Sequence, residues 1–226
     1  MSTEKTAEVG QVEGRVARRR AKVRERLLEV AERLMDERGV DGVTIDDIAD
    51  AADIARRSFY HYFESKYEIL VPIARARTIA LNRRIDRLVA TIEDPAEVMA
   101  TAMRHAFREI ADDLLCRWFI LHSGLPHERL AEGMGESGMR DTLRAIEAGR
   151  FHVGNPEAVR FLLSGAFVSV VSARVEGKRD DEDVDDAVEH LLRMFGLKIT
   201  EAHDIAHRRL RRLPGEDSRR SIANSR

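Results

Sequence analysis

The chain has 226 residues, of which 43% are hydrophobic and 35% are charged, and its formal net charge at pH 7 is -2. This hydrophobic share can bury a real core, so composition excludes a largely disordered chain, and the length allows one or two ordinary domains. The single cysteine, Cys116, excludes a small disulfide scaffold and fits a reducing compartment. Residues 1–14 lack the apolar segment of a secretory signal, and the uncharged stretch 161–173 is shorter than the roughly 20 residues of a membrane span. We therefore expect a cytoplasmic protein that does not enter a membrane.

The first predicted elements are three helices within about fifty residues. From Arg15 onward, apolar residues recur at three- and four-residue steps up to Gly39, which predicts an amphipathic helix closed by a glycine cap. Thr44 can cap a short second helix, because its hydroxyl accepts a hydrogen bond from the free amides of the first turn. A third helix is expected over residues 55–63, after a brief break.

Helical periodicity continues from residue 66 to about residue 92. It then breaks at 94–95, 124–126 and 154–156, and each break contains a proline that marks the start of a new helix. No stretch alternates between apolar and polar residues as a strand would, so the predicted fold is all-α. Residues 214–226 lack an apolar stripe and are expected to form a disordered tail.

A basic segment lies at the start of the first predicted helix. Residues 15–26 contain seven basic residues and one acidic residue, an excess sufficient for several phosphate contacts. Charge runs are more often solvated surfaces, so this feature alone is weak support for nucleic acid. We treat residues 1–19 as a basic, flexible N-terminal arm and name three candidate DNA contacts in it and next to it: Arg18, Arg19 and Arg20.

The third predicted helix strengthens the case for DNA. Arg56 and Arg57 lie in its first turn, where a helix that enters the major groove carries its base-reading donors. Phe59 and Phe63 are four residues apart and can face the core. The polar and aromatic side chains between and before these two anchors must then point away from the core: Ser58, Tyr60, His61 and Tyr62.

The stretch from Val43 to Leu70 resembles the DNA-binding domain of the TetR family of bacterial transcriptional regulators. The resemblance covers roughly residues 20–70, and its most specific part is the aromatic block followed by Ser65 and Lys66. It implies a three-helix helix-turn-helix DNA-binding domain, here residues 20–66, followed by a larger helical ligand-binding and dimerisation domain, residues 67–213. Members of the family are dimers, usually repressors, in which a small molecule bound to the C-terminal domain changes the spacing of the two DNA-binding domains.

Carried over by position, the resemblance implies a DNA contact at each motif residue. Phosphate contacts are implied for Thr44, Tyr60 and Lys66, and positions at or near the groove for Arg56, Arg57, Ser58, His61 and Tyr62. The family often has glycine where Asp53 stands and a small polar residue where Ala55 stands. The turn and the cap of the third helix are therefore expected to differ in detail.

Residues 156–177 are apolar almost all round, and a helix without a polar face must be covered on both sides. One side can pack on its own domain and the other on a second copy, with a further stripe supplied by the next helix. The alternative is the central core helix of a monomer. The expected dimer interface comprises Leu162, Gly165, Ala166, Ser169, Val170, Val188, Leu191, Leu192 and Phe195.

The region from about residue 98 to residue 139 is rich in methionine and aromatic residues, which is typical of an apolar ligand pocket and even more often of a plain core. The candidate lining residues are Met99, Met103, Phe107, Trp118, Phe119, His122, Met134 and Met139. His105 and His122 are candidate polar groups in this cavity, or equally core or surface histidines.

Three further features have plain interpretations. The glycines of 133–138 match a dinucleotide-binding pattern, but no strand precedes them, so we expect a flexible interruption of a helix. His203 and His207 are four apart and could bind a metal ion from one helix face, but the sequence shows no third ligand. Pro72 lies inside the predicted linking helix and either kinks it or marks its beginning.

Together these features predict a homodimeric, ligand-responsive regulator that binds a double-stranded DNA operator and releases it when a small-molecule effector binds. An activator or a corepressor-dependent regulator would have the same parts. A helical enzyme or metal protein is disfavoured, because no catalytic or metal-ligand set is visible in the sequence. We expect no enzymatic activity, no cofactor and no metal.

Overall fold

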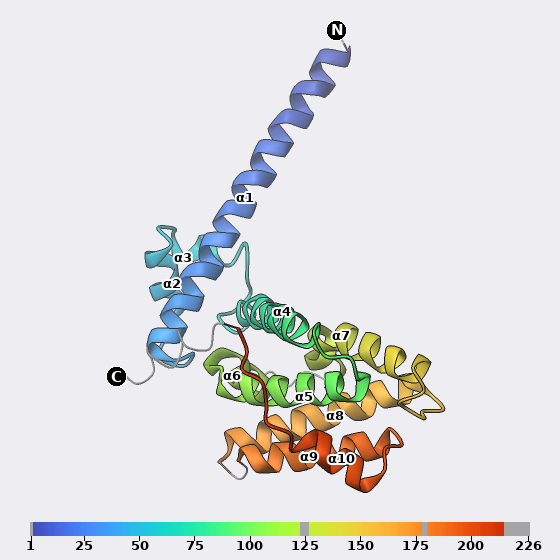
Figure 1. Ribbon diagram of the computed structural model, residues 1–226. Helices are drawn as coiled ribbons and strands as arrows, with labels where there is room; N and C mark the ends of the chain where they lie inside the picture. The colour runs from blue at the N-terminus through green and yellow to red at the C-terminus, as the bar shows by residue number, and fades with distance from the viewer. Residues whose placement is uncertain (1, 123–126, 178–179, 215–226) are drawn as a thin grey trace. The chain divides into compact units, whose positions relative to one another are not determined.

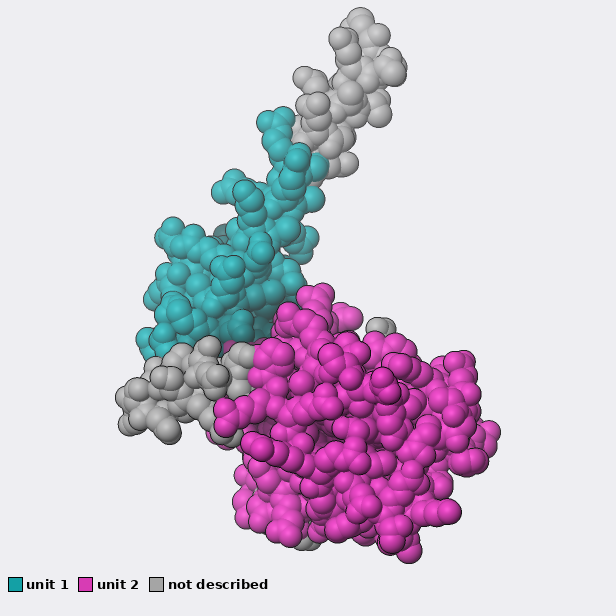
Figure 2. Space-filling model, viewed as in Figure 1, with its two compact units in different colours: residues 1–74 teal, residues 75–226 magenta. Residues whose placement is uncertain are grey.

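The computed structural model describes residues 2–122, 127–177 and 180–214, with side chains at all of these except 2–13 and 127–136. Within these ranges all regular secondary structure is helical, which confirms the predicted all-α fold (Figure 1). The chain divides into two compact units, Met1–Ala74 and Arg75–Arg226 (Figure 2). The predicted Met134 and the tail beyond Pro214 lie outside the described side chains.

The first unit contains α1 (Ser2–Arg38), α2 (Ile45–Ala51) and α3 (Arg56–Phe59). Residues 1–19, expected to form a flexible arm, are helical from Ser2 onward and belong to α1. The segment contains no proline and many residues of good helix propensity, so its two glycines do not stop the helix. The basic residues of 15–26 are therefore displayed on a helix.

The ends of α1 and α2 follow the predicted caps. Gly39 has a φ of 77° and its amide donates to the carbonyl of Met35, 2.9 Å away, which closes α1. Thr44 and Asp47 form a capping box in which each side chain accepts from the other residue's amide. Asp53, between α2 and α3, has a φ of 55°, a left-handed conformation that costs a non-glycine residue roughly 1 kcal/mol. Glycine would adopt this conformation without that cost.

Helix α3 is shorter than predicted, because it ends at Phe59 and the chain continues in turns to Phe63. In those turns the amides of Tyr62 and Phe63 both donate to the Phe59 carbonyl, over 2.9 and 3.1 Å. Ala55 at the N-cap offers no side-chain acceptor to the first turn. A helix without this cap loses about 1 kcal/mol, which fits a short α3.

The second unit is a bundle of helices. Its helices are α4 (Leu70–Val89), α5 (Pro95–Asp112), α6 (Leu114–His122), α7 (His127–Glu147), α8 (Pro156–Val175), α9 (Asp181–Met194) and α10 (Ile199–Ala206). Helix α4 begins in the first unit and continues into the second. Pro72 is its third residue, within the first turn, so it marks the helix start and does not kink it. Helix α7 runs without interruption through 133–138, so the expected flexible interruption there is wrong.

Helix α5 is the centre of the bundle and packs against α6, α7, α8, α9 and α10 (Figure 1). Its buried Phe107 meets Phe167 of α8 with ring centroids 5.6 Å apart. Phe151, between α7 and α8, meets Phe195 after α9 at 4.6 Å. These aromatic pairs join the sequence-distant helices into one core.

Helix α8 is long and apolar enough to cross a membrane by length and composition alone, with a mean hydropathy of 1.5 over an 18-residue window. Only 22% of that window is buried within the chain. Arg174, near the end of the helix, forms ion pairs with Asp112 and Asp181. A single helix of this kind is weak support for a membrane span.

Candidate DNA interface and effector pocket

The α3 region separates an apolar anchor from a polar face. Phe59 and Phe63 are 0% and 3% exposed, and their ring centroids lie 5.8 Å apart in the core of the first unit. Between them, Tyr60 is 47% exposed and His61 is also exposed, whereas Tyr62 is half-buried. The core assignment of the two phenylalanines is confirmed. Tyr60 and His61 lie at the surface as predicted, and Tyr62 does so only in part.

The two arginines at the start of α3 differ in their contacts. Arg56 donates from Nη1 to Asp46 Oδ2 over 2.9 Å, in a pair whose side chains are 61% and 55% exposed. Hydrogen bonding to Tyr60 and the charge of Asp46 raise the pKa of Arg56. Arg57 is exposed and makes no hydrogen bond or ion pair with any residue whose side chain the structure describes. Because an exposed ion pair contributes only about 0–1 kcal/mol, Arg56 can exchange Asp46 for a phosphate or base at small cost.

Basic side chains of α1 lie beside the turns that follow α3. Arg20 donates from Nη2 to the His61 carbonyl over 3.2 Å, and its guanidinium carbon is 6.0 Å from the Tyr62 ring centre. One turn further along, the guanidinium of Arg24 lies 5.1 Å over the ring of Phe63. The basic stripe is thus continuous with the α3 surface. Arg24 belongs to the basic run of residues 15–26, but its position in the sequence gave no reason to single it out as a site residue.

The remaining basic candidates and Thr44 are exposed, with local contacts. Arg18 donates to the Gly14 carbonyl within α1 over 3.0 Å, and Arg19 is also exposed. The Thr44 hydroxyl is held by Asp47, and this hydrogen bond is the largest cause of a lowered Asp47 pKa. A phosphate contact at Thr44 would share a side chain that already caps α2.

Lys66, for which the resemblance implies a phosphate contact, is bound to backbone carbonyls of its own chain. Its ammonium group donates to the carbonyls of Val40, Asp41 and Val43 over 3.1, 3.4 and 2.9 Å. A lysine has three N–H donors, and all three are used here to hold the loop between α1 and α2. Sequence position alone did not reveal this, because the carbonyls come from more than twenty residues upstream.

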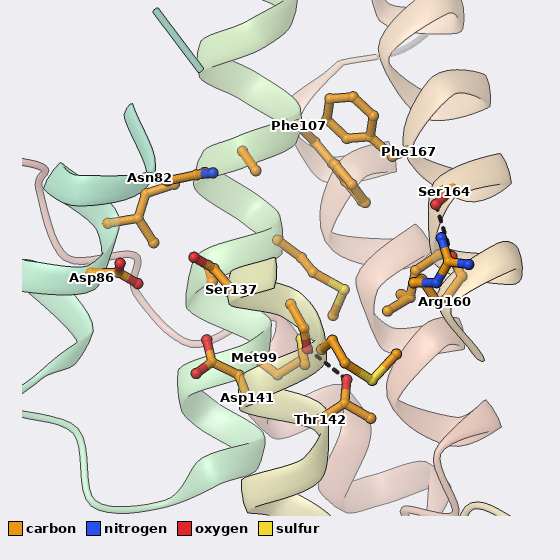
Figure 3. Close-up of a pocket in the computed structure, with 17 residues that line it drawn as sticks. Asn82, Asp86, Met99, Phe107, Ser137, Asp141, Thr142, Arg160, Ser164 and Phe167 are labelled. Atoms are coloured by element: carbon orange, nitrogen blue, oxygen red, sulfur yellow. Dashed lines mark hydrogen bonds between the residues drawn. The ribbon is translucent and has the colours of Figure 1, made fainter. Parts of the chain in front are cut away.

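The second unit contains a cavity of about 90 Å³ between α4, α5, α7 and α8 (Figure 3). Four of the eight predicted lining residues surround it: Met99, Met103, Phe107 and Met139. The other residues around it are Asn82, Ile85, Asp86, Ala102, Ala106, Ser137, Gly138, Asp141, Thr142, Arg160, Leu163, Ser164 and Phe167. The lining is mostly apolar, with polar groups at a few points, as is usual for small-molecule sites.

Two carboxylates lie on one side of this cavity and Arg160 on the other (Figure 3). Arg140 binds both carboxylates, donating to Asp86 Oδ1 and Asp141 Oδ1 over 2.9 Å each. Since a carboxylate has more acceptor sites than these two bonds use, Asp86 and Asp141 can accept further hydrogen bonds. Asp141 is 6% exposed, so the cavity offers a shielded acceptor to a ligand hydroxyl.

Three predicted pocket residues do not line the cavity. Trp118, Phe119 and His122 belong to α6 and are partly exposed, and the rings of Trp118 and His122 stack 4.5 Å apart. His105 is buried and lies 2.9 Å from the Arg211 carbonyl through Nε2, and burial lowers its pKa to about 4. It is therefore a neutral core histidine, one of the alternatives left open by the sequence, and does not line the cavity.

Comparison with family models identifies both units. The model of bacterial regulatory proteins of the tetR family matches residues 27–73, and that of the tetracyclin repressor-like C-terminal domain matches residues 94–208. The chain belongs to the TetR family. The first match covers α2 and α3 with the end of α1, and the second covers the helices that enclose the cavity except α4. The recognition made from Val43–Leu70 is therefore confirmed.

Curated relatives in the TetR family share part of their length with this chain. An uncharacterised HTH-type transcriptional regulator of Mycobacterium tuberculosis is 31% identical over 104 residues, 46% of this chain and 52% of that protein. The transcriptional repressor KstR2 of Mycolicibacterium smegmatis is 31% identical over 87 residues, 38% of this chain and 42% of the repressor. The chain thus matches about half the length of these regulators.

A solved TetR-type structure is similar to this chain over nearly its whole length. RolR in complex with resorcinol is 31% identical, with a TM-score of 0.77 over 87% of this chain and 99% of that one. RolR without ligand has a TM-score of 0.73 over 84% and 99%. Thermus thermophilus FadR bound to lauroyl-CoA, at 23% identity and a TM-score of 0.64, shares the fold.

The TetR-type dimer surface expected on α8 and α9 needs partial correction. Leu162 is 55% exposed and a Cβ added at Gly165 would meet nothing within 4 Å, so this side of α8 is open. Ala166, Ser169 and Val170 are also partly or fully exposed. In contrast, four predicted α9 residues are buried inside the chain and face its own core: Val188, Leu191, Leu192 and Phe195. The uncovered groove between the two helices is lined by Ser169, Val170, Ala173, Asp183, Val184, Asp186, Ala187 and His190.

Proposed function

We propose that this chain is a homodimeric transcriptional repressor of the cytoplasm that releases a DNA operator when a small molecule fills the cavity of its second unit. The observation that carries the proposal is the cavity itself, which is lined by helices of the family-matched C-terminal domain and by α4. Because α4 continues from the DNA-binding unit, a ligand that prefers one position of this helix also selects a state of the whole protein. Repressors among the relatives support the direction of control.

The cavity favours an effector of about one aromatic ring that carries hydroxyl groups. An apolar cavity of about 150 Å³ accommodates benzene. The cavity of about 90 Å³ therefore has to widen slightly to take one ring, and it has no room for a long acyl chain. Asp86 and Asp141 are acceptors, which suit hydroxyl donors better than an anionic ligand. The resorcinol complex of RolR, a protein 31% identical to this one, agrees with this ligand class.

Operator release is tested with DNA selected from a random library by the purified protein. Resorcinol is the probe ligand, and its binding is followed by calorimetry and by displacement of the labelled operator. Ala102→Phe adds a ring to the cavity lining and is expected to abolish probe binding while operator binding persists. Ala148→Phe, at an exposed position after α7, is the matched control and should bind the probe normally. Probe binding by Ala102→Phe equal to that of the control would contradict the site.

Arg57 contacts the DNA directly, and Arg56 does so after its ion pair with Asp46 has broken. If Arg57 contacts a base, Arg57→Ala costs about 1–3 kcal/mol in discrimination between the selected operator and random DNA. Exposed Arg33, paired with Glu37 on α1 outside the basic run, supplies the control Arg33→Ala. Operator selectivity retained by both Arg56→Ala and Arg57→Ala would overturn the assignment of α3 as the reading helix.

The dimer is formed through the open side of α8 and the groove between α8 and α9. Exposed Phe161 and Leu162 are 48% and 55% accessible in the single chain, which is more apolar surface than one helix normally leaves to water. Leu162→Glu places a charge in that surface and is expected to yield monomers by sedimentation, with lost operator affinity. A Leu162→Glu protein that stays dimeric would refute this interface.

A further inference from the structure

A glutamate of α9 and two histidines, one in α10 and one directly after it, converge on one point. Helices α9 and α10 pack against each other, and one ligand atom each from Glu189, His203 and His207 lies within 4.8 Å of the other two. The histidines are four apart, so they share a helix face. Glu189, fourteen residues before His203, is the third ligand that sequence spacing did not reveal.

The distances suit a tetrahedral metal ion. His203 Nδ1 is 2.9 Å from Glu189 Oε2, and His207 Nε2 is 3.5 Å from the same oxygen. Zn²⁺ binds nitrogen and oxygen at about 2.0–2.2 Å, which in a tetrahedron places the ligand atoms roughly 3.3–3.5 Å apart. The two histidine nitrogens lie within 4.8 Å of each other, so side-chain rotations must bring the three ligand atoms to these separations.

A second observation concerns His207 alone. Its Nε2 atom is shielded from solvent and makes no hydrogen bond within the described part of the chain. Buried polar atoms nearly always have such a partner, and a bound ion is one of the few explanations for an exception. Asp186 Oδ1 lies 3.4 Å from this nitrogen, so a second carboxylate is close to the cluster.

The charge and exposure of the cluster also favour a cation. Asp186 and Glu189 supply two carboxylates close to the histidine nitrogens. The Glu189 side chain is 12% exposed and that of His203 is 59% exposed, so the cluster is partly shielded and still reachable from water. Two imidazoles select transition metals over Mg²⁺ and Ca²⁺, which prefer oxygen ligands.

We propose that Glu189, His203 and His207 bind one divalent transition-metal ion, with Zn²⁺ as the representative, and that Asp186 completes a four-ligand set. The ion links the end of α10 to α9 and stabilises the C-terminal part of the second unit. The site is separate from the cavity between α4, α5, α7 and α8, and it stands independently of the proposed repressor function. It replaces the expectation of no metal that the sequence alone supported.

The test uses tag-free, full-length protein that has been treated with a chelator and then dialysed. Zn²⁺ is titrated by calorimetry, and Co²⁺ absorption reports the coordination geometry. We expect one Zn²⁺ per chain, a tetrahedral Co²⁺ spectrum, and a Tm rise of about 5–10 °C at a hundredfold excess over Kd. Absence of Zn²⁺ binding by this protein would overturn the proposal.

Variants assign the binding to these side chains. His203→Ala and His207→Ala should each abolish stoichiometric binding and the Tm rise, and Glu189→Gln should weaken binding at least about tenfold while it preserves shape. His152→Ala removes an exposed histidine outside α9 and α10 and should bind Zn²⁺ as the unmodified chain does. Circular dichroism without metal checks that each variant is folded. Equal Zn²⁺ affinity in the double variant His203→Ala/His207→Ala would refute the site.

Discussion

The carboxylate of Asp185 joins α9 to α5, and its removal is expected to be costly. It accepts from Arg104 Nε and Nη2 over 2.7 and 2.8 Å and from Arg108 Nη2 over 2.6 Å. The side chains of Arg104 and Asp185 are only 6% and 13% exposed, and that of Arg108 is 15% exposed. One shielded carboxylate thus balances two shielded guanidinium groups.

The substitution Asp185→Asn keeps the size of the side chain and removes its charge. Loss of one partner from a buried ion pair costs about 3–5 kcal/mol, because the remaining charge stays desolvated without compensation. For a chain of this length such a loss lowers Tm by on the order of 10 °C. Urea unfolding followed by far-ultraviolet circular dichroism, on metal-free protein, measures the change.

Asp112→Asn is the matched control. Asp112 also pairs with an arginine, Arg174, over 3.3 Å, but its own side chain is 69% exposed. Water screens this pair, so its loss should cost no more than about 1 kcal/mol. If Asp185→Asn destabilises the protein no more than Asp112→Asn does, burial does not decide the strength of the α5–α9 pair and the reasoning fails.

Three further predictions address groups inside the two units. Burial lowers the pKa of His105 to about 4, so its neutral form stabilises the fold fully above about pH 6.5 and this stability is lost as the pH falls towards 4. Between about pH 7.5 and pH 5, His105 should lower the free energy of unfolding by about 2 kcal/mol, and this loss should disappear in His105→Gln. An identical pH dependence of stability in both proteins would contradict this assignment. Burial and then the charge of Asp113 raise the pKa of Cys116, so a thiol reagent should react with the native protein at least about 100-fold more slowly than with the urea-unfolded chain, and comparable rates would show an open thiol. Lys66→Met should destabilise the first unit by about 1–3 kcal/mol and leave the salt dependence of DNA binding unchanged; a smaller salt slope at unchanged stability would restore the phosphate contact.

Local signals in the sequence predicted several of the helix boundaries. Pro95 and Pro156 are the first residues of α5 and α8, Gly39 closes α1, and Thr44 caps α2. Each of these residues acts through its own backbone geometry or through an amide three residues away, which is information that a short sequence window contains. The end of α3 was less predictable. Ala55 provides no side-chain cap, and whether the helix continues beyond Phe59 or gives way to turns depends on a few backbone hydrogen bonds.

Contacts between distant segments were not predictable in the same way. The cavity takes Asn82 from α4 and Arg160 from α8, which no spacing rule connects to Met99. Likewise, the sequence showed the apolar stripe of α9 but not which surface covers it. In the structure Val188 of this stripe is buried within its own chain. The position of Glu189 was unpredictable for the same reason. Only the packing of the helices brings it to the two histidines that the sequence showed as a pair.

The position of Pro72 in the first turn gives α4 a mechanical property. Beyond that turn the helix runs unbroken to Val89, and the ten residue steps from Pro72 to Asn82 span about 15 Å. A tilt of about 5° over this rod displaces one end relative to the other by about 1 Å, which is comparable to the tolerance of a base contact. A proline one or two turns later would have kinked the helix, and the kink would have absorbed such a tilt. Because Pro72 lies in the first turn, the rest of α4 can move as one rigid helix.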